Sequence, residues 1–134
     1  MSTSVLMELN AQLDSPDAVA VLAAAWDVFD MATDLCDRIT FDEDSDELQA
    51  MVAAQQCSEG RDRLPLPESG RPVAAPPPGP GAAGLVPYVR LLEHVGDALA
   101  RLSAAADDET ASSLTQVREL ASGAAAALTR VRGQ

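Results

Sequence analysis

The carboxylates of this chain are the side chains most able to do chemistry, and four of them fall at helical spacing. Asp27, Asp30, Asp34 and Asp37 recur three or four residues apart, directly after Trp26. On a helix this spacing places the four carboxylates in one column. The simplest interpretation is a solvated face. The second is a surface that binds a basic protein partner, with Trp26 as its aromatic anchor.

A third interpretation is an acidic mimic of DNA that blocks a DNA-binding protein. Duplex DNA carries about one charge per 1.7 Å of its axis. One column of aspartates does not by itself establish that spacing. The three interpretations therefore stay open at the level of sequence.

The stretch "DEDSDE" at 42–47 resembles the opening of a calcium-binding loop, because it alternates Asp42, Asp44 and Asp46. Such a loop also needs glycine at its sixth position and glutamate at its twelfth. Glu47 and Ala53 stand there instead. The sequence therefore predicts an acidic helix start and no metal site.

The remaining reactive side chains do not form a catalytic grouping. In an antiparallel hairpin that turns near residue 42, Cys36 and Cys57 would be offset by about 14 Å. A disulfide needs Cα atoms within about 7 Å, so both are predicted to be buried, reduced thiols. His94, the only histidine, is either a general base or a surface residue, and surface is favoured. No catalytic residue and no cofactor is predicted, and an enzyme is not favoured.

The amino-acid composition and the net charge favour one fold class and exclude some classes of binding partner. Hydrophobic residues make up 47% and aromatic residues 3% of the chain, which favours close helix packing over a sheet. The net charge of −12 excludes direct nucleic-acid binding. No apolar run is long enough to span a membrane, and the start "MSTSVLMELN" lacks the features of a secretion signal. We therefore expect a cytoplasmic protein.

Hydrophobic periodicity and helix-end signals predict a short helix over 4–13 and longer ones over 14–39, 42–64, 85–106 and 107–133. Ser15 is the predicted cap of the second helix, and Asp44 with Glu47 the capping box of the third. In the third helix the predicted inward face is Leu48, Met51, Val52 and Gln55. The last two helices have continuous inward seams: Leu85, Tyr88, Leu92, Val95, Leu99 and Leu102, then Leu114, Val117, Ala121, Ala124, Leu128 and Val131.

Residues 65–84 hold seven of the nine prolines, so no regular element is expected there. One helical hairpin then lies on each side of a flexible Pro/Gly-rich crossover loop. Neither hairpin has enough apolar surface to be stable alone, which predicts one all-α domain over 1–134, a four-helix bundle. A tether between two modules is the less favoured alternative. Pairing between chains would give a homodimer, and a small molecule could bind in the Ala-rich interior.

Three stretches together resemble an uncharacterised actinobacterial family of short helical proteins associated with natural-product biosynthesis. They are "CSEGRDRL" at 57–64, "PGPG" at 78–81 and "YVRLLEHVGDALARL" at 88–102. The match covers about a third of the chain. The resemblance implies an accessory role in specialised metabolism and carries over no catalytic residue.

Overall fold

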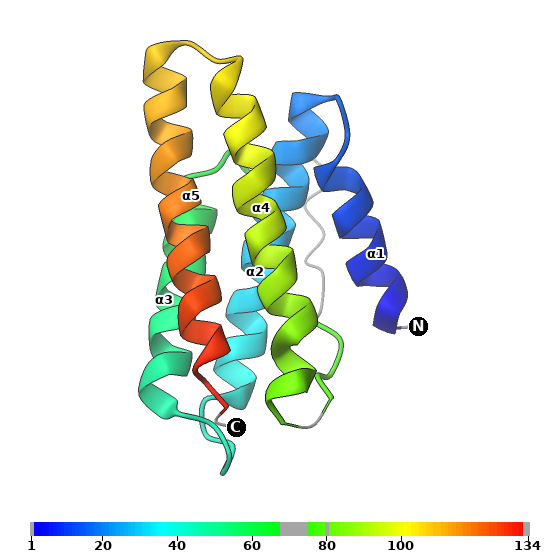
Figure 1. The fold of residues 1–134 in the computed structure, drawn as a ribbon, viewed down its shortest axis with the longest axis vertical. Helices are drawn as coiled ribbons and strands as arrows, with labels where there is room; N and C mark the ends of the chain where they lie inside the picture. The colour runs from blue at the N-terminus through cyan, green and yellow to red at the C-terminus, as the bar shows by residue number, and fades with distance from the viewer. Residues whose placement is uncertain (1, 68–74, 80, 133–134) are drawn as a thin grey trace.

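The computed structural model of the chain describes residues 2–67, 75–79 and 81–132, and most of these are helical (Figure 1). The prediction of an all-α protein is confirmed for them. The helices are α1 (Ser2–Leu13), α2 (Ala18–Ile39), α3 (Glu47–Asp62), η1 (Ala82–Leu85), α4 (Val86–Ala104) and α5 (Asp108–Thr129).

Three of the helices begin at an aspartate whose side chain accepts a backbone N–H of the first turn. Asp17, Asp46 and Asp107 accept from Val19, Gln49 and Thr110, respectively. Each bond satisfies a donor that the helix itself leaves free.

The predicted caps at Ser15 and Asp44 are wrong. The hydroxyl of Ser15 accepts the N–H of Asp17 in the preceding turn, and the carboxylate of Asp44 pairs with Arg132. The third helix consequently begins at residue 47 rather than 42.

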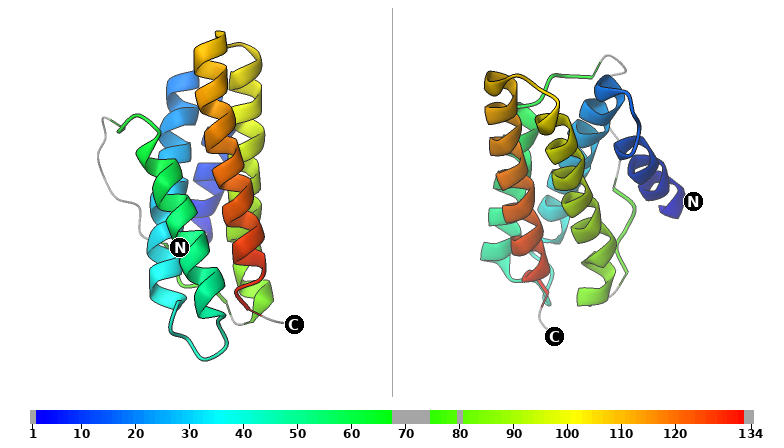
Figure 2. Two further views of the ribbon diagram at one scale, coloured as in Figure 1. Left: turned by 90° about the vertical axis from the view of Figure 1, so that its left-hand side faces the viewer. Right: turned by 45° about the horizontal axis from the view of Figure 1, so that its top comes forward.

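Helices α2 to α5 each pack against two others of the set. α2 contacts α3 and α4, and α5 also contacts α3 and α4. In Figure 1 α2 and α3 run in opposite directions, as do α4 and α5. α1 lies outside these four, along the side where α2 meets α4 (Figure 2).

The seams predicted for the last two helices are confirmed, except that Leu102 of α4 is only partly buried. The inward face predicted for α3 is wrong except at Val52, which is partly buried and packs against the core. α3 buries four small residues, Ala50, Ala53, Cys57 and Gly60, whereas Leu48, Met51 and Gln55 are exposed. The hydrophobic character of Leu48 and Met51 favours burial, but the way α3 packs places them in solvent.

At Gly60 the small residue faces the ring of Phe29 on α2, which is fully buried. A Cβ atom added at Gly60 would lie 2.7 Å from Cζ of Phe29. Real Cβ atoms do not approach other atoms so closely, so the ring occupies the space that a side chain at this position would need. α3 therefore approaches α2 over glycine and alanine, and its large apolar side chains turn outward.

The described part of the Pro/Gly-rich segment is bonded to the helices around it. Arg38 of α2 donates to the carbonyl of Ala75 over 2.7 Å, and the hydroxyl of Tyr88 donates to that of Pro76. The rest of the flexible stretch predicted over 65–84 includes residues 68–74 and 80, which lie outside the described residues.

Arg132 joins this segment to the turn between α2 and α3. Its Nη1 donates to the carbonyls of Gly79 and Gly81, over 2.9 and 3.1 Å. The same guanidinium lies 3.5 Å from carboxylate oxygens of Asp42 and Asp44. Only 8% of the side chain is exposed. One arginine near the C-terminal end thus connects three segments that are distant in sequence.

Gly84 is required for this arrangement. A Cβ at this position would lie 1.9 Å from the carbonyl oxygen of Gly79, the same oxygen that accepts from Arg132. Backbone atoms cannot yield as a flexible side chain can. Gly79 and Gly84 therefore allow the backbone on either side of this turn to approach closely.

Substituting Gly60→Ala is expected to destabilise the protein. Overpacking of a core costs about 1–3 kcal/mol, of which the better helix propensity of alanine returns about 1 kcal/mol. Urea denaturation followed by circular dichroism measures the change. Gly96→Ala in α4 is the matched control, because no heavy atom lies within 4 Å of its added Cβ. It should be neutral or stabilising, and equal losses in both variants would contradict the packing argument.

Substituting Arg132→Gln is expected to lower the free energy of unfolding by about 2 kcal/mol, because hydrogen bonds from a buried charged donor are lost. Arg130→Gln removes an exposed guanidinium two residues away and should change stability by about 0.5 kcal/mol or less. Urea denaturation of both variants gives the comparison. Equal effects of the two substitutions would show that Arg132 has no special structural role.

Candidate partner-binding surface

The predicted binding residues all lie outside the buried stripe of α2, but their environments differ. Trp26 is partly buried and packs against the core. Asp27 and Asp30 are also partly buried, while Asp34 and Asp37 are exposed. The structure therefore brings the five side chains to the outer side of one helix. They do not form a uniformly solvated column.

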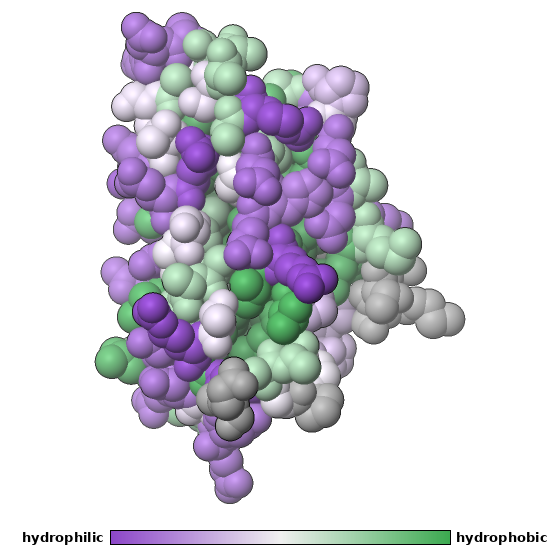
Figure 3. Space-filling model, in the orientation of Figure 1, coloured by the Kyte–Doolittle hydropathy of each residue, from purple (hydrophilic) through white to green (hydrophobic). Residues whose placement is uncertain are grey.

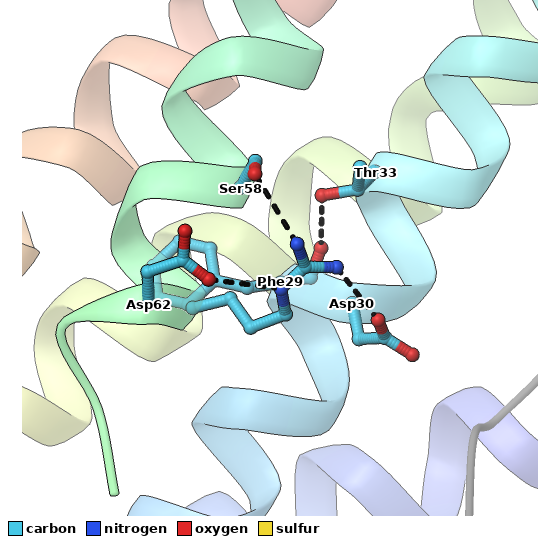
Figure 4. A network of polar contacts seen from close by, with 6 residues as sticks. Phe29, Asp30, Thr33, Ser58 and Asp62 are labelled. Atoms are coloured by element: carbon cyan, nitrogen blue, oxygen red, sulfur yellow. Dashed lines mark hydrogen bonds and ion pairs between the residues drawn. The ribbon is translucent and has the colours of Figure 1, made fainter. Parts of the chain in front are cut away.

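Asp30 is engaged within the chain (Figure 4). Its Oδ1 lies 2.9 Å from Nη1 of Arg61 on α3, and only 22% of the Asp30 side chain is exposed. The same guanidinium donates to the hydroxyl of Ser58 over 3.2 Å and lies 3.5 Å from the carboxylate of Asp62. This ion pair joins α2 to α3 beside the Phe29–Gly60 contact. Asp30 has an evident structural role, whatever it contributes to binding.

Asp34 pairs with Arg38 one turn later at 3.2 Å, and both side chains are about half exposed. An exposed pair of this kind contributes about 0.5 kcal/mol or less. No ion pair involves Asp37 among the described residues. The C-terminal end of the column, at Asp37, is consequently the part most accessible to a partner.

Asp27 has the most perturbed carboxyl group of the column. Partial burial, and then the negative charge of Asp30, raise the pKa of Asp27 from 3.8 to about 6. Both causes disfavour the ionised carboxylate. A cation brought close to this face would act in the opposite direction and lower the pKa.

The carboxylates of "DEDSDE" have roles that differ from metal binding. Asp42 and Asp44 pair with Arg132, and Asp46 caps α3. The backbone N–H of Asp46 donates to the carbonyl of Val131 over 2.5 Å. Within the described ranges no three His, Cys, Asp or Glu side chains are grouped to hold a metal ion. The alternating aspartates therefore fasten the α2–α3 turn to the C-terminal end of the described chain.

Both cysteines are buried and unbonded, in agreement with the prediction. Burial and the charge of Asp37 raise the pKa of the Cys36 thiol to about 12. Burial and the neighbouring Cys36 raise the pKa of Cys57 well above its usual value, although Arg61 opposes the shift. Since the thiolate is the nucleophilic form, neither side chain suits covalent catalysis.

His94 lies partly exposed on α4, with 22% of its side chain accessible, where it contacts the N-terminal part of the chain. Its Nδ1 lies 2.6 Å from the side-chain oxygen of Asn10 on α1, and its Nε2 lies 2.7 Å from a carboxylate oxygen of Asp14, directly after α1. The amide of Asn10 donates to the carbonyl of Leu6, which turns its oxygen toward the ring. Arg101 of α4 also donates to the carbonyl of Leu13. These polar contacts attach α1 to α4 and occupy both ring nitrogens.

Two grooves open on the outer surface. The larger, of about 760 Å³, lies between α4 and α5, and includes Glu93, Gly96, Asp97, Arg118 and Glu119 in its lining. The smaller, of about 280 Å³, lies between α3 and α5. Both are open to solvent, and the larger one also reaches the buried side chains of Leu92 and Ala125.

Sequence reasoning missed the exposed apolar side chains near the start of α3. The available signal was the series Ala50, Ala53, Cys57 and Gly60, which repeats at three- and four-residue intervals. Small residues at this spacing indicate the face along which another helix packs closely, just as a row of large hydrophobic residues does. That pattern would have turned Leu48 and Met51 outward.

No protein-family model, no curated protein and no solved structure matches this chain. In the described part of the chain, no helix is both long and apolar enough to cross a lipid bilayer. The function must therefore be argued from the surface itself.

Substituting Asp27→Asn should change the pH dependence of stability. A raised carboxyl pKa favours the folded state at low pH, and this contribution is lost as the pH rises through about 6. The variant should be more stable than the parent by about 1 kcal/mol near pH 7.5, and the difference should vanish only near pH 3, below the ordinary carboxyl pKa of 3.8. This value allows for solvent screening of a partly exposed group.

Thermal and urea unfolding across this pH range measure the effect. Asp34→Asn is the control, since it removes a carboxylate from the same face at an exposed position. The burial argument fails if Asp34→Asn gives the same gain, or if Asp27→Asn gives none near pH 7.5.

Proposed function

We propose that this protein is a non-enzymatic helical interaction module. Its outer α2 face, formed by Trp26, Asp27, Asp30, Asp34 and Asp37, binds a protein partner that carries arginine or lysine side chains. In this proposal helices α2 to α5 act as one four-helix bundle of two hairpins, with α1 as an added layer. The bundle presents the face as a rigid surface.

The observation that supports this proposal is the environment of Asp27. A partly buried carboxylate next to a second carboxylate has its pKa raised to about 6, so ionising it is unfavourable in the free protein. A guanidinium or ammonium group placed between Asp27 and Asp30 would stabilise both charges. The adjacent Trp26 offers the aromatic face that such cations prefer.

Two alternatives have less support. Small-molecule binding in the bundle interior would need a hollow lined by core residues, and the groove between α4 and α5 reaches two of these, Leu92 and Ala125. DNA mimicry needs a regular row of free carboxylates. Asp30 and Asp34 are paired with Arg61 and Arg38, which interrupts such a row.

Catalysis has no supporting group among the side chains that sequence analysis considered. The thiols of Cys36 and Cys57 are held protonated by burial, and both nitrogens of His94 contact α1. A place in specialised metabolism rests only on the resemblance of the three stretches noted from the sequence. Homodimer formation also remains a prediction.

The proposal is tested with two variants of equal charge. Asp27→Asn/Asp34→Asn/Asp37→Asn removes three carboxylates from α2, and Glu93→Gln/Asp97→Asn/Glu119→Gln removes three from the α4–α5 groove. Each purified protein serves as bait in quantitative affinity enrichment from its native host extract. Partners of the parent protein should fall at least about ten-fold with the α2 variant, because contacts between complementary charges are lost. They should be retained by the groove variant.

Equal loss with both variants would point to non-specific attraction by net charge, and the assignment to α2 would be abandoned. Retention of all partners by the α2 variant would do the same. Circular dichroism and urea unfolding of both variants establish that the fold is intact in each comparison.

A further inference from the structure

Three large apolar side chains are exposed close together in the sequence, at the end of the molecule where α2 turns into α3. Phe41 is 81% exposed, Leu48 is 68% exposed and Met51 is 54% exposed. Phe41 lies in the turn that leads into α3, while Leu48 and Met51 lie three residues apart in its first two turns. Side chains at that spacing are neighbours on one helix face.

The position of these side chains follows from the way α3 packs. The inner face of α3 is made of small residues because Phe29 fills the space against Gly60. Leu48 and Met51 are on the opposite face, so a simple rotation of α3 to bury them would bring larger residues against the ring. The chain thus leaves two hydrophobic side chains of a well-packed helix in water and forgoes the free energy of burying them. Clusters of this kind mark interaction surfaces.

The charges around this apolar cluster are negative. Five carboxylates lie in the same stretch, on Asp42, Glu43, Asp44, Asp46 and Glu47. Arg132 is the only cation paired with any of them among the described residues. No ion pair in the same ranges involves Glu43 or Glu47. In Figure 3 green hydrophobic atoms protrude at the left-hand edge, over α3, among purple hydrophilic ones.

We infer that Phe41, Leu48 and Met51 form a docking surface for a cationic amphipathic helix of another protein. The apolar stripe of that helix covers the three side chains, and its arginine or lysine residues lie against the carboxylates of 42–47. Apolar anchors supply the affinity, and complementary charge sets the orientation and the choice of partner.

A second copy of this chain does not satisfy these requirements. Two copies joined through this surface would bring their carboxylates together, and each chain carries a net charge of −12. Anionic lipid and nucleic acid are repelled for the same reason. The acidic rim therefore selects a basic partner over self-association.

This inference rests on the proposed role as an interaction protein, but it concerns a separate surface with its own partner chemistry. The α2 column has one aromatic residue, partly buried, and would bind mainly through charge. The surface at the start of α3 has three exposed apolar anchors. The two surfaces can be distinguished because substitutions in the α2 column leave the surface at the start of α3 unchanged, and the reverse.

The test uses synthetic peptides and the full chain labelled with ¹⁵N. The probe peptide has about 18 residues, with leucines at helical spacing i, i+3, i+4 and i+7 and arginines on the flanks. One control peptide has the same composition with the leucines shuffled. A second has glutamate in place of arginine. Chemical-shift titrations locate the binding site and give the affinity.

The chain offers matched protein variants. Leu48→Gln/Met51→Gln removes two exposed anchors, and Val19→Gln/Leu66→Gln makes the same change at two exposed apolar side chains elsewhere. Asp27→Asn changes the α2 column alone. All five positions are partly or fully exposed, so the fold should be retained, and circular dichroism verifies this.

The probe peptide is expected to shift resonances of residues 41–51, with a dissociation constant on the order of 10 µM. Leu48→Gln/Met51→Gln should weaken binding at least about ten-fold, whereas Val19→Gln/Leu66→Gln and Asp27→Asn should leave it unchanged. Loss of binding in Asp27→Asn alone would support the α2 surface and overturn this one.

Three other results would also overturn the inference. They are absence of binding, equal binding of the shuffled peptide, and shifts centred outside residues 41–51. Sedimentation equilibrium of the parent and Leu48→Gln/Met51→Gln proteins supplies the remaining comparison. A dimer that the two substitutions abolish would identify a second copy as the occupant and would exclude the basic helix proposed here.

Discussion

The contact between the ring of Phe29 and the backbone of Gly60 is the constraint on which most of this structure depends. The ring would overlap any larger side chain at residue 60, so α3 turns Gly60 toward α2, on the same face as its other buried small residues. This rotation of α3 places Arg61 against Asp30. It also turns Leu48 and Met51 into solvent. One steric requirement inside the molecule therefore determines the polar network and the apolar surface outside it.

Arg132 plays the corresponding role at the end of the molecule where the α2–α3 turn lies. Its guanidinium bonds the carbonyls of Gly79 and Gly81 and pairs with Asp42 and Asp44. A nearly buried arginine is stable only when its donors find acceptors. The loop carbonyls accept hydrogen bonds from Nη1, and the two aspartates balance the charge, although Nε has no hydrogen-bond partner among the described residues. As a result, the carboxylates of Asp42 and Asp44 pair with an arginine of the same chain. An acidic stretch that resembles a metal-ligand set therefore holds two parts of the chain together.

The negative charge of the protein is thus divided between two uses. Asp17, Asp46 and Asp107 cap helices, and Asp30 and Asp34 pair with arginines. These carboxylates stabilise the fold. Asp27, Glu43 and Glu47 form no ion pair among the described residues, and they lie near Trp26 or near exposed apolar side chains in the sequence. The two candidate surfaces are therefore the places where carboxylates without an ion pair lie near apolar side chains that the core does not fully bury.

The amino-acid sequence by itself determined that the chain is helical, where its long helices lie, and which residues of α4 and α5 face inward. Those properties depend on local propensity and on a hydrophobic period that repeats over several turns. The column of aspartates on α2 also follows from spacing alone. What only the tertiary structure decided is the rotation of α3, the contact of His94 with α1 and the clasp of Arg132. Each depends on side chains from segments far apart in the chain, so a pattern along one helix carries too little information to fix it. Gly60 faces inward because a ring from another helix already fills the space beside it, and hydrophobicity along α3 does not encode that ring.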